Sequence, residues 1–197
     1  AGEPVERWAR HSRRAARSAG IEVLVVADDS LSAPRVLVVG IGNTRHRDEG
    51  VGVRAVQALK RAYDLPGGVE AIAVEGPDFD LLDALEEAGH AIFVDCVFAQ
   101  ERPGATFRVP LDELARPADV PDSLHEPSLL EALGVLEMLG RRPSAVLIGV
   151  QVGDTSPGLD LSHEVAARLP AIVDEIVHEL RLVGVRPVRR ADAGERG

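Results

Sequence analysis

RVLVVGIGNTRHRDEGVGVRAVQAL, residues 35–59, changes its hydrophobic pattern twice. Residues 35–39 form a continuous aliphatic run closed by Gly40, which is typical of a strand buried on both faces. After a polar loop, apolar residues recur at helical spacing, at Val51, Ala55, Val56 and Leu59. Asp48 is a candidate N-cap for that helix, since acidic residues suit a helix N-terminus. The stretch therefore predicts a strand, a loop and a helix.

The rest of the chain continues this alternation. Strands are predicted at 69–74, 91–94, 106–109 and 145–150, and helices at 79–87, 127–139 and 163–182. Prolines on either side of residues 106–109 favour an edge strand there. The order β-α-β-α-β-β-α-β-α predicts an α/β three-layer sandwich, in which helices cover both faces of a mostly parallel, twisted sheet. Its crossover connections should be right-handed.

The pattern also suggests how the chain is divided. Residues 34–184 should form a single α/β domain. Residues 1–33 are predicted to be an N-terminal extension, although the apolar run at 21–27 could be another strand. Residues 185–197 are predicted to be a polar C-terminal tail.

Composition excludes some classes of function. The formal net charge of the 197-residue chain is −10, which disfavours sequence-independent binding to nucleic acid. Cys96 is the only cysteine, so an intrachain disulfide is impossible and a reducing compartment is favoured. No apolar run is long enough to span a bilayer, and residues 1–17 lack the apolar stretch of a signal peptide. We therefore expect a cytoplasmic protein that does not bind membranes.

Chemistry is expected at one edge of the sheet, because open α/β sheets bind ligands beyond the carboxyl ends of their strands. Glu49 follows the first strand, Asp95 ends the third, and His125 precedes a later helix. Two carboxylates and one imidazole suit a divalent metal that keeps coordination positions open. Each residue also has a structural alternative: Glu49 favours its helix dipole, Asp95 caps a turn, and His125 lies on the surface. Cys96 has no evident base partner, so it is not predicted to be a nucleophile.

Four separated segments resemble the hydrogenase maturation proteases. They are VLVVGIGNTRHRDEGVGVRAVQAL (36–59), AIFVDCV (91–97), SLHEPSLLEAL (123–133) and LIGVQVGDTSPGLDLSHEV (147–165). They follow the order of that family's motifs: G-x-G-N and D-E-G-x-G-V, a strand ending in Asp, S-x-H before a helix, and a late strand and loop. The resemblance implies a phosphorylase/hydrolase-like α/β fold.

The family's metal-binding Glu, Asp and His match Glu49, Asp95 and His125. The resemblance implies that these residues bind the nickel of an immature [NiFe]-hydrogenase large subunit and that its C-terminal peptide is then removed. The nickel would come with the substrate, so the isolated protein should hold it weakly, although another divalent metal could occupy the site in vitro. A monomer is the simplest expectation.

Two departures from the family pattern concern loops. Residues 75–78 read EGPD where many relatives have two glycines, which affects partner specificity. The loop before Asp48 is more polar than usual, and its His46 is either an extra ligand or part of a solvated loop.

Three other functions are considered. A peptidyl-tRNA hydrolase shares the G-x-G-N opening and could use Asn43, His46 and Asp95, but its RNA substrate favours a basic cleft. A maturation chaperone could sense nickel through the same ligands without cutting. A nucleotide-binding module is disfavoured because Arg45 occupies the position of the third fingerprint glycine and no Walker A lysine is present.

Overall fold

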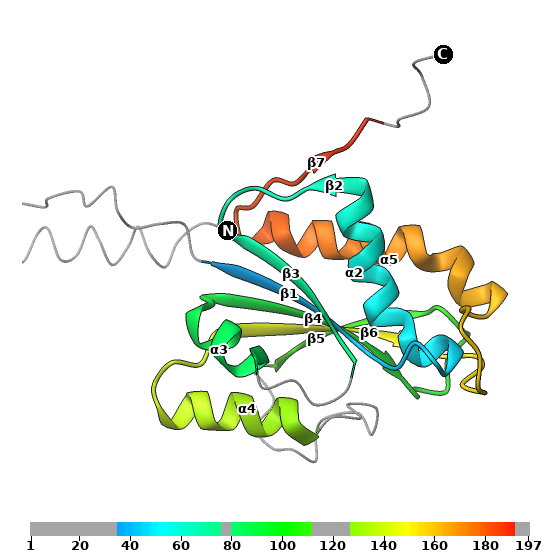
Figure 1. The fold of residues 1–197 in the computed structure, drawn as a ribbon, viewed down its shortest axis with the longest axis horizontal. Helices are drawn as coiled ribbons and strands as arrows, with labels where there is room; N and C mark the ends of the chain where they lie inside the picture. Colours follow the sequence, from blue (N-terminus) through cyan, green and yellow to red (C-terminus); the bar gives the residue numbers. More distant parts are fainter. Residues whose placement is uncertain (1–34, 76–79, 112–126, 192–197) are drawn as a thin grey trace, which may run out of the picture. The chain divides into compact units, whose positions relative to one another are not determined.

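The fold lies within the unit Ala33–Gly197. The computed structural model describes residues 35–75, 80–111 and 127–191 (Figure 1). The possible strand at 21–27, most of the predicted loop at 111–124, and His125 lie outside the described residues.

Five strands form the central sheet, in the order β3-β1-β4-β6-β5. They are β1 (Val36–Ile41), β3 (Val69–Val74), β4 (His90–Val97), β5 (Thr106–Pro110) and β6 (Ser144–Gln151). The first four in the sheet order run parallel, and β5 pairs antiparallel with β6 at one edge. The predicted mostly parallel sheet and its edge strand are confirmed.

Helices cover both faces of the sheet, as predicted (Figure 1). They are α2 (Val51–Ala62), α3 (Asp80–Glu87), α4 (Pro127–Met138) and α5 (His163–Leu182). Helices α2 and α5 pack on one face around side chains such as Val38, Ile92 and Ile148. Helices α3 and α4 pack on the other face around Phe93 and Leu147, among others. The alternation of strand residues between two cores explains why the middle of each central strand is a continuous apolar run, such as Ala91–Val94 in β4.

Two local predictions were wrong. Asp48 is not the N-cap of α2, because a 3-10 helix, η1 (Arg47–Gly50), comes first and Gly50 is the cap residue. Asp95 does not end its strand, since β4 continues to Val97 through parallel pairing with β6. Residues Cys96 and Val97 are buried, so their pairing and burial extend the strand by two residues.

A small second sheet was not predicted. Strand β2 (Tyr63–Asp64) directly follows α2, and it pairs antiparallel with β7 (Val188–Arg189). Two-residue strands carry no periodicity, so sequence patterns give no signal for them. Among the described residues, no helix has both the length and the apolar character that crossing a membrane requires.

Glycines allow the start of α2 to pack directly on the sheet. A Cβ atom added at Gly52 would lie 2.1 Å from the carbonyl oxygen of Val94 and 2.3 Å from that of Ile41. Gly42 adopts a φ of 152°, and a Cβ atom there would lie 2.0 Å from the carbonyl oxygen of Glu49. These contacts leave no room for a side chain, so the glycines set how closely η1 and α2 approach β1 and β4.

Candidate functional site

The carboxyl ends of β1, β3, β4 and β6 lie together at one end of the sheet, because these strands are parallel. We call this end of the strands the carboxyl edge of the sheet and the opposite end its amino edge. Glu49 lies in η1, which follows β1 and contacts β4. Asp95 lies near the end of β4. The structure therefore places two of the three predicted site residues at the predicted edge of the sheet.

Asp95 is almost fully buried, with 2% of its surface exposed. Its Oδ1 atom accepts a hydrogen bond of 2.7 Å from the backbone N–H of Cys96. Asp95 alternates with Phe93 and Ala91, whose side chains belong to the core under α3 and α4. Its side chain therefore belongs to that face of the sheet, at the carboxyl edge.

Glu49 is more accessible, since its side chain is 22% exposed. Its Oε2 atom lies 3.3 Å from Nδ1 of His46, three residues earlier. The structure thus brings His46 to the candidate site, where it contacts a predicted ligand. The His46 side chain is also 43% exposed, so it is solvated as well as within reach of Glu49, and its role as an extra ligand stays a prediction.

Cys96 has the chemistry of a buried thiol rather than that of a nucleophile. It is 1% exposed, and burial raises the pKa of its thiol far above the ordinary value. The negative charges of Asp95 and Glu49 raise this pKa further. The thiol is therefore protonated at neutral pH, and the prediction that it is not a nucleophile agrees with its surroundings.

The approach of α4 to the site can be inferred from its connections. Helix α4 leads through a short link into Ser144, the first residue of β6, at the amino edge of the sheet. Since α4 packs on the sheet beneath Phe93, its N-terminal end points toward the carboxyl edge (Figure 1). His125 precedes Pro127, the first residue of α4, by two positions, although His125 itself lies outside the described residues.

No group of three or more His, Cys, Asp or Glu side chains is placed to hold a metal within residues 35–75, 80–111 and 127–191. This part of the chain contains only two of the three predicted ligands, Glu49 and Asp95. The metal-binding assignment therefore stays a prediction.

The loop after β1 is ordered by its own polar side chains. The Oδ1 atom of Asn43 accepts a hydrogen bond of 3.1 Å from the backbone N–H of Arg45. The hydroxyl of Thr44 donates to Oε2 of Glu75 at 2.6 Å, which connects the loop to the end of β3. Asn43, which a peptidyl-tRNA hydrolase would use on its substrate, is thus engaged in a turn.

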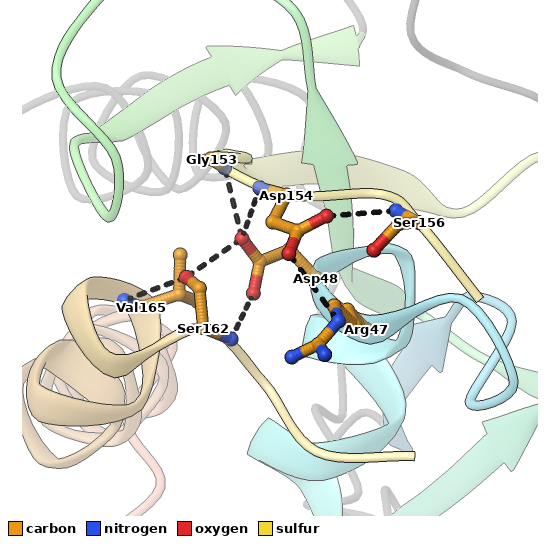
Figure 2. Close-up of polar contacts among 7 residues, drawn as sticks. All are labelled: Arg47, Asp48, Gly153, Asp154, Ser156, Ser162 and Val165. Carbon is orange, nitrogen blue, oxygen red and sulfur yellow. Dashed lines mark hydrogen bonds and ion pairs between the residues drawn. The ribbon is translucent and has the colours of Figure 1, made fainter. Parts of the chain in front are cut away.

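The structure gives Asp48 a different role from the predicted helix cap. It is 0% exposed, and its carboxylate accepts hydrogen bonds from the loop between β6 and α5 (Figure 2). Its partners lie more than a hundred residues away in sequence, so no local pattern could reveal this role. The only signal is that Asp48 adjoins Glu49.

Comparison with known protein families identifies the chain. Residues 53–179 match the family model described as HycI, hydrogenase maturation protease. This match includes Asp95 and His125 and begins four residues after Glu49.

Individual relatives agree with the family model. The chain is 30% identical to the hydrogenase 2 maturation protease of Escherichia coli over 159 residues, which cover 79% of this chain and 96% of that protein. It is 33% identical to the hydrogenase expression/formation protein HupD of Thiocapsa roseopersicina over 165 residues, covering 82% of this chain and 75% of that protein.

Solved structures show the same fold. The hydrogenase maturating endopeptidase HybD from E. coli superposes with a TM-score of 0.73 at 30% identity, covering 81% of this chain and 99% of that chain. The [NiFe] hydrogenase maturation protease HycI from Thermococcus kodakarensis, at 22% identity and a TM-score of 0.60, covers 75% of this chain and 93% of that chain and supports the fold alone. From its sequence relatives, the family model and this fold, the chain belongs to the hydrogenase maturation protease family.

Proposed function

We propose that this protein removes a C-terminal peptide from the nickel-loaded precursor of a [NiFe]-hydrogenase large subunit. In this proposal Glu49, Asp95 and His125 bind the nickel that the substrate carries. The observation that carries it is the presence of Glu49 and Asp95 at the same sheet edge in a hydrogenase maturation protease. The partner and the site of cleavage are inferred from the resemblance to this family.

The arrangement supports hydrolysis without a nucleophilic side chain. The only cysteine is buried and its pKa is raised, so its thiol is not ionised at neutral pH. Nickel held by three ligands would polarise the scissile carbonyl or lower the pKa of a bound water. The Glu49 carboxylate, which is partly exposed, is the better placed of the two carboxylates to exchange a proton with that water.

Weak retention of nickel by the isolated protein is expected from the small number of ligands. Three ligands with open positions form a site of moderate affinity, in contrast to a closed four-ligand structural site. We expect the isolated protein to lose nickel during dialysis against a chelator and to keep its fold. Nickel that stays bound stoichiometrically through that dialysis would contradict the idea that the metal arrives with the substrate.

The test is intact-mass spectrometry of the large-subunit precursor encoded in the same genome, incubated with this protein before and after nickel loading. Loss of a short C-terminal peptide only from the nickel-loaded precursor is the expected result. Equal cleavage of both precursors would show that cleavage does not require nickel in the precursor. Capture of the loaded precursor without any loss of mass would instead indicate a maturation chaperone that does not cut.

Substitutions test whether each of the three proposed ligands contributes to processing. Glu49→Gln, Asp95→Asn and His125→Ala should each reduce processing by at least about a hundredfold if each group contributes to metal chemistry. Glu70→Gln and His178→Ala are matched controls that replace exposed side chains outside the candidate site, and both should process at the wild-type rate. Circular dichroism must show a folded protein for each variant. Normal processing by the His125→Ala protein would remove His125 from the site.

We further propose a cytoplasmic monomer that does not bind nucleic acid. The net charge of −10 opposes binding to a phosphate backbone. Size-exclusion chromatography with light scattering should give a mass near 21.0 kDa. A stable dimer under these conditions would contradict the monomer.

A further inference from the structure

Asp48 forms a buried polar cluster with the loop that connects β6 to α5 (Figure 2). Its Oδ2 atom accepts hydrogen bonds from the backbone N–H groups of Gly153 at 2.8 Å and Asp154 at 2.9 Å, and from the hydroxyl of Ser162 at 2.8 Å. Its Oδ1 atom accepts from the backbone N–H of Ser162 at 2.7 Å. We call Asp48 with these four donors the Asp48 clamp.

The clamp satisfies a charge that would otherwise be costly to bury. Asp48 is 0% exposed, and a buried carboxylate is tolerated only when hydrogen bonds replace its lost hydration. All four hydrogen bonds are short and are assisted by the charge of the carboxylate. Ser162 is also the N-cap of α5, so the carboxylate lies at the positive end of a 20-residue helix dipole.

Backbone hydrogen bonds join the same two loops. The N–H of Asp48 donates to the carbonyl of Asp154 at 3.1 Å, and the N–H of Arg47 donates to the carbonyl of Gly158 at 3.0 Å. The N–H of Gly158 donates in return to the carbonyl of Arg45 at 2.8 Å. Arg47 adopts a positive φ of 43°, which costs energy for a residue with a side chain and is held by these contacts.

Glu49 directly follows Asp48 in the sequence. Its N–H donates to the carbonyl of His46 at 3.0 Å, and its carbonyl accepts from the N–H of Asn43 at 3.1 Å. These bonds lie within the loop of Glu49 itself, whereas the clamp fixes that loop to the connection between β6 and α5 and to the N-cap of α5. Any shift of Asp48 would therefore move the backbone of Glu49 relative to Asp95 on β4.

We propose that Asp48 is a positioning residue, whose four hydrogen bonds from Gly153, Asp154 and Ser162 hold Glu49 in its working place. The functional part of this inference rests on the proposed role of Glu49 in processing. The structural part, that the clamp immobilises Glu49, stands on its own. A shift of Glu49 by about 1 Å is enough to reduce the rate of a reaction that depends on its placement.

The test uses Asp48→Asn and Ser162→Ala in the full-length protein, with Ser162→Thr as the conservative variant. Asparagine keeps the shape of Asp48 but presents an NH₂ group to a backbone donor. Ser162→Ala removes one donor, and Ser162→Thr retains a hydroxyl that can serve both the clamp and the N-cap. Ser144→Ala is the matched control, because it removes a hydroxyl that hydrogen-bonds His90 at 2.7 Å at the amino edge of the sheet.

The first readout is hydrogen exchange at the Glu49 amide, measured by NMR at a temperature where circular dichroism shows every variant folded. Exchange at this amide should be at least about tenfold faster in the Asp48→Asn and Ser162→Ala proteins, as expected for the loss of a charge-assisted hydrogen bond. Ser162→Thr and Ser144→Ala should leave it within about twofold of wild type. Unchanged exchange in both clamp variants would overturn the inference.

The second readout is the rate of precursor processing. The kcat should fall by about a hundredfold in Asp48→Asn and about tenfold in Ser162→Ala, with KM within about twofold, since the Asp48 carboxylate is 0% exposed and has no surface to offer a substrate. Faster exchange without a fall in kcat would overturn the positioning role. If the wild-type protein does not process the precursor, the proposed function fails, and the exchange experiment still decides whether the clamp holds Glu49.

Discussion

The carboxyl edge and the amino edge of the central sheet differ in how far their charged side chains are buried. At the carboxyl edge, Asp48 and Asp95 are buried, and the backbone approaches so closely around Gly52 that no side chain fits. At the amino edge, Arg35 pairs with Glu70 and Glu87, and all three side chains are about half exposed or more. Buried carboxylates must be satisfied by a fixed set of donors, whereas exposed pairs remain hydrated and interchangeable. The carboxyl edge is therefore the one that the fold holds in a defined geometry.

The largest expected effect on stability comes from a substitution at Gly52. Gly52→Ala would place a Cβ atom 2.1 Å from the carbonyl oxygen of Val94, so α2 must move away from the sheet. We expect the free energy of unfolding to fall by about 3 kcal/mol or more, measured by urea denaturation. The matched control is Gly134→Ala in α4, where nothing lies within 4 Å of the added atom. That control should be neutral or gain about 0.5–1 kcal/mol, and equal losses in both proteins would show that the carboxyl edge is not specially close-packed.

The next effect is the low reactivity of the Cys96 thiol in the folded protein. Because burial and the nearby carboxylates raise its pKa in the folded state, Cys96 should react with iodoacetamide at pH 8 far more slowly in native than in urea-unfolded protein. The same shift in pKa makes the stability of the protein depend on pH. The thiol has no effect on stability below the unfolded pKa of about 8.5, and stability falls as pH rises above it. Rapid native labelling, followed by mass spectrometry, would show that this end of β4 is open.

A smaller effect is expected at the amino edge. Arg35→Ala removes two exposed ion pairs, so it should change the free energy of unfolding by less than about 1 kcal/mol. Added salt should reduce even that difference, since exposed charges are screened. A loss as large as that of Gly52→Ala would end the distinction between the two edges.

The smallest effect concerns Asp154, which is at the carboxyl edge but partly exposed. Hydrogen bonds from Ser156, together with the charge of Arg47, hold the pKa of Asp154 below its ordinary value. Its stabilising contribution is therefore complete above the unfolded pKa of about 3.9 and is lost as pH falls through the lower folded value. The stability difference between wild type and Asp154→Asn should be constant from about pH 5 to 8 and should shrink only in acid. A difference that varies near pH 7 would mean that another group is titrating.

The predicted strands and helices were largely confirmed, because buried parallel strands and amphipathic helices have distinct periods. The strand at Val69–Val74 and the helix at His163–Leu182 have the predicted bounds. The errors lie where the pattern is ambiguous. A polar residue inside β4 looked like the end of the strand, and an acidic residue before α2 looked like its cap.

For the candidate site, Glu49 and Asp95 were found at the predicted edge, and the third residue, His125, lies outside the described part of the chain. His46 was already considered as an extra ligand from the sequence, whereas the role of Asp48 needed the structure. The partners of Asp48 lie at positions 153–162, and no local sequence signal links these segments.

The sequence by itself determined the layered α/β architecture and the residue types at the sheet edge, since both follow from local periodicity and from the rule that ligands bind beyond the strand ends. Only the tertiary structure decided that Asp48 is buried while Glu49, its neighbour in sequence, is partly exposed. The physical reason is that the solvation of a charge depends on its surroundings in space. Here those surroundings are the loop and helix that the fold brings back to η1.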